Sequence, residues 1–166
     1  PGGLALLTEA VRHHSLISAW QILLTRSGVL DGKTFNAPCW KTFRDIAPVE
    51  SAASLCNVMR VAKVDQVRKE TCDLLGTMYP KARNSAVRAD MLSALSHAAR
   101  WDKQEQVRRQ AVRALGETAS PDAVETLADC LKQPELHKDA VSALCNLRTP
   151  RAVPVLKKLF QENPTS

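Results

Sequence analysis

The sequence predicts an all-α protein in which antiparallel helix pairs stack into an α-α superhelix, or solenoid. Three observations support this prediction: a composition that favours helices, a segment that recurs with helical spacing, and amphipathic segments between its copies. Only 6 of the 166 residues are glycine, and only 4% are aromatic. Strands favour β-branched and aromatic residues, so this composition disfavours a β-sandwich. The chain is long enough for one domain with a continuous core.

The recurring segment occurs at residues 67–76, 107–116 and 136–145. The first two copies begin with Val-Arg and end in glycine, whereas the third has His137 in place of the arginine and Cys145 in place of the glycine. Apolar or small residues at positions i, i+4, i+7 and i+8 of each copy form one stripe of a helix. Each copy therefore predicts a helix that needs another helix to cover its stripe.

The partner helices are predicted by amphipathic segments that alternate with the copies, at residues 51–63, 85–101, 121–131 and 150–160. Proline is tolerated in the first turn of a helix, where its missing N–H has no intrahelical partner to lose. Pro121 and Pro150 fit that position, with Ser120 and Thr149 as N-caps. Asp65 is placed to cap the helix of the first copy.

These segments give three helix pairs and a closing helix, at about residues 51–79, 85–118, 121–147 and 150–162. Short connections such as residues 118–120 make neighbouring helices antiparallel. The first 50 residues do not fit the repeat. Terminal repeats of solenoids are often atypical, so we assign residues 1–50 to a divergent N-terminal helical cap or irregular repeat and residues 51–166 to the repeat array.

Residues 106–116, followed by residues 120–127, resemble the short HEAT-like repeats of the phycobilisome-lyase type. Residues 149–156 repeat the second half of that pattern. The resemblance is strongest over about residues 103–160 and extends to about residue 51. It implies an α solenoid that acts as a protein-binding scaffold, with the second helix of each pair lining a concave face.

The resembling family also includes enzymes. Its two-iron hydroxylases carry paired His-Glu dipeptides, and this sequence contains no His-Glu dipeptide. The bilin lyases have no short motif to transfer, and no catalytic residue of the HEAT-like DNA glycosylases maps onto this chain. We therefore predict no enzymatic activity, no cofactor and no metal site. A fragment of an enzyme whose active site lies outside this chain is the remaining alternative of this class.

The formal net charge of +6 is concentrated in the middle of the chain. Residues 60–113 contain 12 basic and 6 acidic residues, whereas residues 114–166 contain 6 basic and 7 acidic residues. Such a local excess of positive charge favours acidic partners.

Six of the basic residues occupy outward positions on the helices of the three copies, and stacking would align them in a strip: Arg68, Lys69, Arg108, Arg109, Arg113 and Lys138. One interpretation is a docking surface for an acidic protein segment or for nucleic-acid phosphates. The other is a solvated face paired with nearby acidic residues, in which Arg68 and Arg108 brace neighbouring helices. No aromatic residues are interleaved for base stacking, so within the docking interpretation we favour a protein over a nucleic acid.

Other candidate sites fit their chemistry poorly. Residues 27–34 end like a phosphate-binding loop, but Ser27 replaces the first glycine of that motif and a helix rather than a strand precedes it, so we expect an exposed turn. Cys39 has no histidine or acid placed by the sequence to activate it as a nucleophile. The four histidines show no consistent metal-ligand spacing.

Trp20, Trp40 and Trp101 are candidate interface anchors, but Trp101 ends an apolar stripe, so we expect it in or at the edge of the core. No apolar run approaches the roughly 20 residues that span a bilayer, and we predict no membrane partner. The five cysteines form no C-x-x-C pair, which favours reduced thiols in an intracellular, cytoplasmic or nuclear protein.

Overall fold

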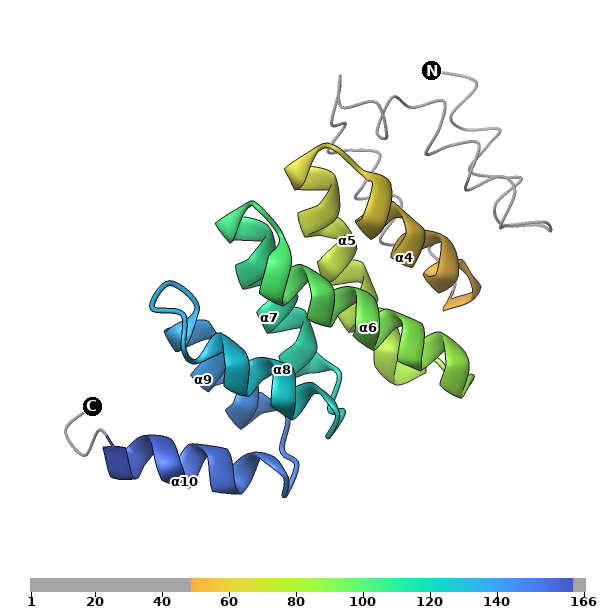
Figure 1. Cartoon of the computed structure of the whole chain (residues 1–166). Helices are drawn as coiled ribbons and strands as arrows, with labels where there is room; N and C mark the ends of the chain where they lie inside the picture. The colour runs from red at the N-terminus through yellow and green to blue at the C-terminus, as the bar shows by residue number, and fades with distance from the viewer. Residues whose placement is uncertain (1–48, 163–166) are drawn as a thin grey trace, which may run out of the picture.

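The computed structural model describes residues 49–162, which form seven α-helices and two short 3₁₀ helices (Figure 1). The elements are η1 (Val49–Ser51), α4 (Ala52–Val61), α5 (Asp65–Met78), η2 (Tyr79–Lys81), α6 (Ser85–Trp101), α7 (Glu105–Glu117), α8 (Ala123–Cys130), α9 (His137–Asn146) and α10 (Ala152–Glu162). These residues contain no strand, which confirms the predicted all-α class. The N-terminal cap expected at residues 1–50 lies almost entirely outside the described residues.

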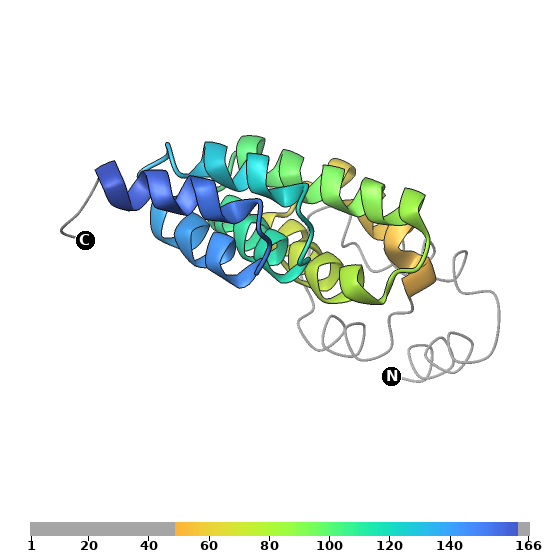
Figure 2. The same ribbon diagram turned by 90° about the horizontal axis from the view of Figure 1, so that it is seen from below.

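The helices form two layers, which are seen edge-on in Figure 2. In one layer α4 packs on α6 and α6 on α8; in the other α5 packs on α7 and α7 on α9. Within each pair, α4 contacts α5, α6 contacts α7 and α8 contacts α9. This alternation of pairs along the chain is the α-α superhelix that the sequence predicts.

The buried stripe of each recurring segment lies in the core as predicted. Val67, Val107 and Leu136, which begin the three copies, are completely buried. The later stripe positions are also buried, among them Leu75, Leu115 and Leu144 in the aliphatic pairs. Helices of the first layer add further buried side chains, which are mostly Ala, Leu and Met: Leu55, Met91, Leu95, Ala99 and Leu127. One continuous core therefore runs through all three pairs.

The glycine that ends the first two copies allows the second helices to approach closely. A Cβ atom on Gly76 would lie 3.0 Å from the Cα atom of Ala114, and one on Gly116 would lie 2.8 Å from the Cα atom of Ala143. Only glycine fits where two helix backbones are this close. Cys145, which replaces the glycine in the third copy, is exposed, since within the described residues no further second helix packs against it.

Helix α8 begins slightly later than the sequence predicts. Ala123 N–H donates to the carbonyl of Ser120 at 3.2 Å, so Pro121 lies in a tight turn immediately before α8. Ala152 N–H donates in the same way to the carbonyl of Thr149 at 3.0 Å before α10. The N-cap residue of α5 is Val64, not Asp65 as the sequence predicts. Asp65 is the first residue of the helix, and its carboxylate accepts a hydrogen bond of 2.9 Å from the backbone amide of Gln66.

Candidate functional site

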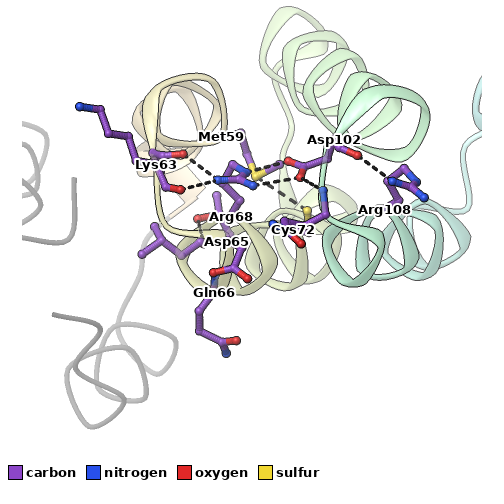
Figure 3. Close-up of polar contacts among 12 residues, drawn as sticks. Met59, Lys63, Asp65, Gln66, Arg68, Cys72, Asp102 and Arg108 are labelled. Atoms are coloured by element: carbon purple, nitrogen blue, oxygen red, sulfur yellow. Dashed lines mark hydrogen bonds and ion pairs between the residues drawn. The ribbon is translucent and has the colours of Figure 1, made fainter. Parts of the chain in front are cut away.

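Arg68 joins the first helix pair to the second (Figure 3). Its Nε donates to Asp102 Oδ2 at 2.7 Å and its Nη2 donates to Oδ1 at 2.9 Å. Its Nη1 donates to the carbonyls of Ala62 and Lys63, in the loop of its own pair, at 2.9 and 3.1 Å. The side chains of Arg68 and Asp102 are only 7% and 9% exposed, so this bidentate ion pair is shielded from water.

Burial alone would raise the pKa of the Asp102 carboxyl, because burial disfavours its charged form. Hydrogen bonds from Arg68 and from the backbone amide of Gln104 outweigh that effect, and the pKa of Asp102 is lowered. The same hydrogen bond raises the pKa of Arg68. Both groups are therefore held in their charged forms.

Arg108 repeats the role of Arg68 one pair further along the chain. Its Nη1 donates to the carbonyl of Asp102, in the loop between α6 and α7, at 3.0 Å, and its Nη2 donates to Glu135 of the third pair at 2.9 Å. His137 stands at the same position of the third copy, with Nδ1 2.9 Å from the carbonyl of Leu131. The second position of the repeat thus fastens each second helix to its own loop, and the two arginines also reach the next pair.

Arg68 and Arg108 therefore hold the stack together, as the second interpretation of the sequence proposed. Of the six residues in the predicted strip, these two donate to backbone carbonyls of the loops as well as to a carboxylate of a neighbouring segment. We do not retain Arg68 as a partner contact because its side chain is almost completely buried. Arg108 is half-buried and contributes little free surface.

The other four residues of the strip, Lys69, Arg109, Arg113 and Lys138, lie on what we call the second-helix face, formed by the outward side chains of α5, α7 and α9. Arg113 Nε donates to Asp139 Oδ1 at 2.9 Å. Arg109 pairs with Glu105 at 2.8 Å and with Asp139 at 3.6 Å.

The pairing changes the predicted charge of this face. Two arginines and two carboxylates neutralise one another, so the predicted basic strip is a face of mixed charge. Lys69 and Lys138 form no ion pair with any residue of the described part of the chain, and Arg113 is 57% exposed despite its pairing. Gln110 Nε2 donates to Asp73 at 3.1 Å, which links α7 to α5 on the same face. Contacts between repeats therefore hold Arg109, Gln110 and Arg113 in place on this face.

A groove lies between α4 and α6. It is at the edge of the stack where the loops of the first two pairs lie side by side (Figure 1). This α4–α6 groove has a volume of about 700 Å³, and its exposed lining residues are Arg60, Val61, Lys63, Ser93, His97, Trp101 and Lys103. Trp101 is 72% exposed and Val61 is 51% exposed.

The expectation that Trp101 packs in or at the edge of the core is wrong. Ala98 and Ala94, one and two turns earlier on the same side of α6, are buried, but α4 ends at Val61 and Trp101 lines the open groove beside that end. Trp101 is consequently left beside the open groove. Trp20, Trp40, Cys39 and residues 27–34 lie outside the described residues.

The described cysteines and histidines form no chemical site. Cys56, Cys72 and Cys130 are buried, and burial raises the pKa of Cys56 and of Cys130 to about 11. Residues 49–162 contain no group of three or more His, Cys, Asp or Glu side chains that could hold a metal ion. Within the same residues, no helix has both the length and the apolar character needed to cross a membrane.

The fold and its pairwise contacts define an α solenoid, a class of protein built from stacked helix hairpins. The family model of HEAT repeats matches residues 52–135 and residues 92–166, which together cover more than half of the chain. The chain belongs to the HEAT-repeat family, whose repeats typically serve as protein-interaction scaffolds. A search of curated proteins found no match to the chain.

Proposed function

We propose that this protein is a scaffold that binds a partner protein through the second-helix face. The observation that carries the proposal is the fixed arrangement of charged side chains on that face, where Asp139 of α9 pairs with both Arg109 and Arg113 of α7. A surface whose side chains are already ordered loses less conformational entropy when a partner binds.

Lys69, Arg113 and Lys138 are the contact residues in this proposal, since they come from three successive second helices. They suit an acidic segment of a protein, because separate positive charges among negative ones select a complementary charge pattern. A nucleic-acid phosphate backbone would favour a continuous positive surface, which the acidic residues of this face interrupt. The buried free thiols of Cys56 and Cys130 are compatible with a reducing, intracellular compartment.

The test compares proteins captured from a cell lysate by the immobilised full chain and by two triple variants. The first variant carries Lys69→Glu, Arg113→Glu and Lys138→Glu. The control carries Lys81→Glu, Arg83→Glu and Lys157→Glu, three exposed residues away from the second-helix face. Both variants change the net charge equally, so a difference between them reports the location of the charges. Circular dichroism establishes that both remain folded.

We expect a set of proteins that the wild type and the control capture and the first variant loses, by roughly tenfold or more for residues central to an interface. Equal capture by both variants would contradict the proposal. A gel-shift assay with a random DNA duplex at two salt concentrations tests the other partner class. Affinity that falls steeply with salt and is lost in the first variant would favour nucleic-acid binding instead.

A further inference from the structure

The α4–α6 groove combines exposed apolar side chains with positive charge that residues 49–162 do not neutralise. Its lining includes four cationic side chains and one carboxylate, namely Arg60, Lys63, Arg68, Lys103 and Asp102. Arg68 and Asp102 neutralise each other, which leaves three positive charges. Those three side chains form no ion pair with any residue from 49 to 162. The charge excess of the middle of the chain thus gathers partly here, away from the second-helix face.

The groove also exposes large apolar side chains. Trp101 and Val61 are two of the four large hydrophobic residues that are exposed in the described chain, and they line the same groove. Tryptophan is enriched among residues that dominate binding energies, because its large ring buries much apolar area with few rotatable bonds. Met59, Ala94 and Ala98 complete an aliphatic floor.

We infer that the α4–α6 groove is a docking site for an acidic protein segment that carries an apolar anchor residue. The anchor packs against Trp101 and Val61, and the acidic residues on either side of it face Arg60, Lys63 and Lys103. This inference concerns the first-helix layer and does not depend on the function proposed for the second-helix face.

Charge distinguishes this occupant from the chain's own N-terminal part. Residues 1–48 contain five basic residues (Arg12, Arg26, Lys33, Lys41 and Arg44) and three acidic ones (Glu9, Asp31 and Asp45), so they carry the same sign of charge as the groove. Trp101 is the only Phe, Tyr or Trp side chain among the groove's lining residues, and the floor beneath it is aliphatic. Single-stranded nucleic acid favours successive aromatic platforms for its bases, so we favour a polypeptide.

The test uses two matched sets of short synthetic peptides and the full chain. Each peptide has one central Leu, Phe or Trp, flanked by Asp and Glu in the first set and by Asn and Gln in the second. Binding is measured by fluorescence anisotropy of labelled peptides. The variants are Trp101→Ala and the pair Lys63→Glu with Lys103→Glu, and the matched control is Lys81→Glu with Arg83→Glu, which has the same charge change outside the groove.

We expect acidic peptides to bind and their amide counterparts to bind roughly tenfold more weakly or worse. Trp101→Ala and the groove charge reversal should each weaken the acidic peptides by a similar factor, and the control should leave affinity unchanged. Because Trp101 is mostly exposed, its replacement should not alter the thermal unfolding curve, which separates lost binding from lost folding.

Three results would overturn the inference. The first is no preference for the acidic set, and the second is binding that is insensitive to Trp101→Ala. The third is a single-stranded oligonucleotide that binds with the same dependence on Trp101, which would assign the groove to nucleic acid. A photo-crosslinking amino acid at position 101 tests whether the chain's own residues 1–48 occupy the groove. Crosslinks to the acidic peptide support the inference, and crosslinks to residues 1–48 contradict it.

Discussion

The guanidinium of Arg68 and the carboxylate of Asp102 form a two-point hydrogen-bonded ion pair that connects α5 to the loop between α6 and α7. The two residues are 34 positions apart in the sequence, so the pair joins one repeat to the next rather than neighbours on one helix. Its shielding from water makes the consequences of breaking it large, because either partner left alone would be a buried charge without a counter-ion.

Replacing Asp102 by alanine should therefore destabilise the protein by about 3 kcal/mol, as expected for removing one partner of a buried pair. Urea-induced unfolding of the full chain measures the change. The matched control is Arg151→Ala, which removes the exposed pair with Asp122, whose side chains are 68% and 70% exposed. That control should cost less than about 1 kcal/mol. Equal losses would show that Arg68–Asp102 contributes no more than a surface pair.

The same ion pair should make the unfolding free energy depend on pH in the acidic range. The pKa of Asp102 is lowered in the folded protein, so the folded state favours the carboxylate more than the unfolded state does. This contribution is present above the unfolded pKa of about 4 and is lost as the pH falls through the lower folded pKa. Unfolding free energies measured between neutral pH and pH ~3 should decrease less in Asp102→Asn than in the wild type. If the unfolding free energies of the two proteins depended on pH in the same way, the lowered pKa of Asp102 in the folded state would be contradicted.

The sequence predicted the stripes of the second helices because burial follows directly from the spacing of Val107, Ala111 and Leu115. The sequence left the role of Arg68 open. An outward arginine at that position reaches either solvent or the loop of the next repeat, and the distance between neighbouring repeats, which the sequence does not give, decides between these two. The prediction for Trp101 failed for a related reason. Whether the last residue of a stripe is covered depends on where the neighbouring helix ends, and α4 ends too early to cover it.

The α4–α6 groove was not predicted at all. Its cationic residues Arg60, Lys63 and Lys103 lie in the last turn of α4 or just after the ends of α4 and α6, and no periodicity connects them. The available signal was the local charge excess of residues 60–113 together with the nearby Trp101. The repeat pattern places that excess on the second-helix face, where pairing with Glu105 and Asp139 removes much of it.

Gly116→Ala tests the close approach of the second helices. Alanine has the better intrinsic helix propensity, by about 1 kcal/mol, so at an open helix position this change would stabilise. Here the new Cβ would lie 2.8 Å from the Cα atom and 2.9 Å from the Cβ atom of Ala143, and backbone atoms cannot move aside cheaply. We expect a net loss of about 1–3 kcal/mol in unfolding free energy. Adding Ala143→Gly should recover part of the loss, and a double variant that is merely additive would contradict a direct clash.

The cysteines should differ sharply in reactivity. Cys145 is exposed, whereas Cys56, Cys72 and Cys130 are buried and burial raises the pKa of all three. Since the thiolate is the reactive form, iodoacetamide at pH ~8 should label Cys145 while the fold is intact and the other three only after denaturation. Peptide mapping by mass spectrometry identifies each site, with the urea-denatured chain as the control. Rapid labelling of Cys72 in the native protein would contradict its position in the core.

Ala119 and Arg148 occupy the same place in successive repeats, directly before the Ser-Pro and Thr-Pro turns, and both have left-handed backbone conformations, with φ of 51° and 48°. An L-residue with a side chain is strained there, and glycine is not. Ala119→Gly should therefore raise the unfolding free energy by about 0.5–1 kcal/mol, even though glycine makes the unfolded chain more flexible. The control is the same substitution at Ala89, an exposed position within α6, where it should lower the unfolding free energy by about 1 kcal/mol. If the backbone at Ala119 is strained, the changes in unfolding free energy measured by urea unfolding have opposite signs in the two variants. A loss of stability in both variants would contradict this strain.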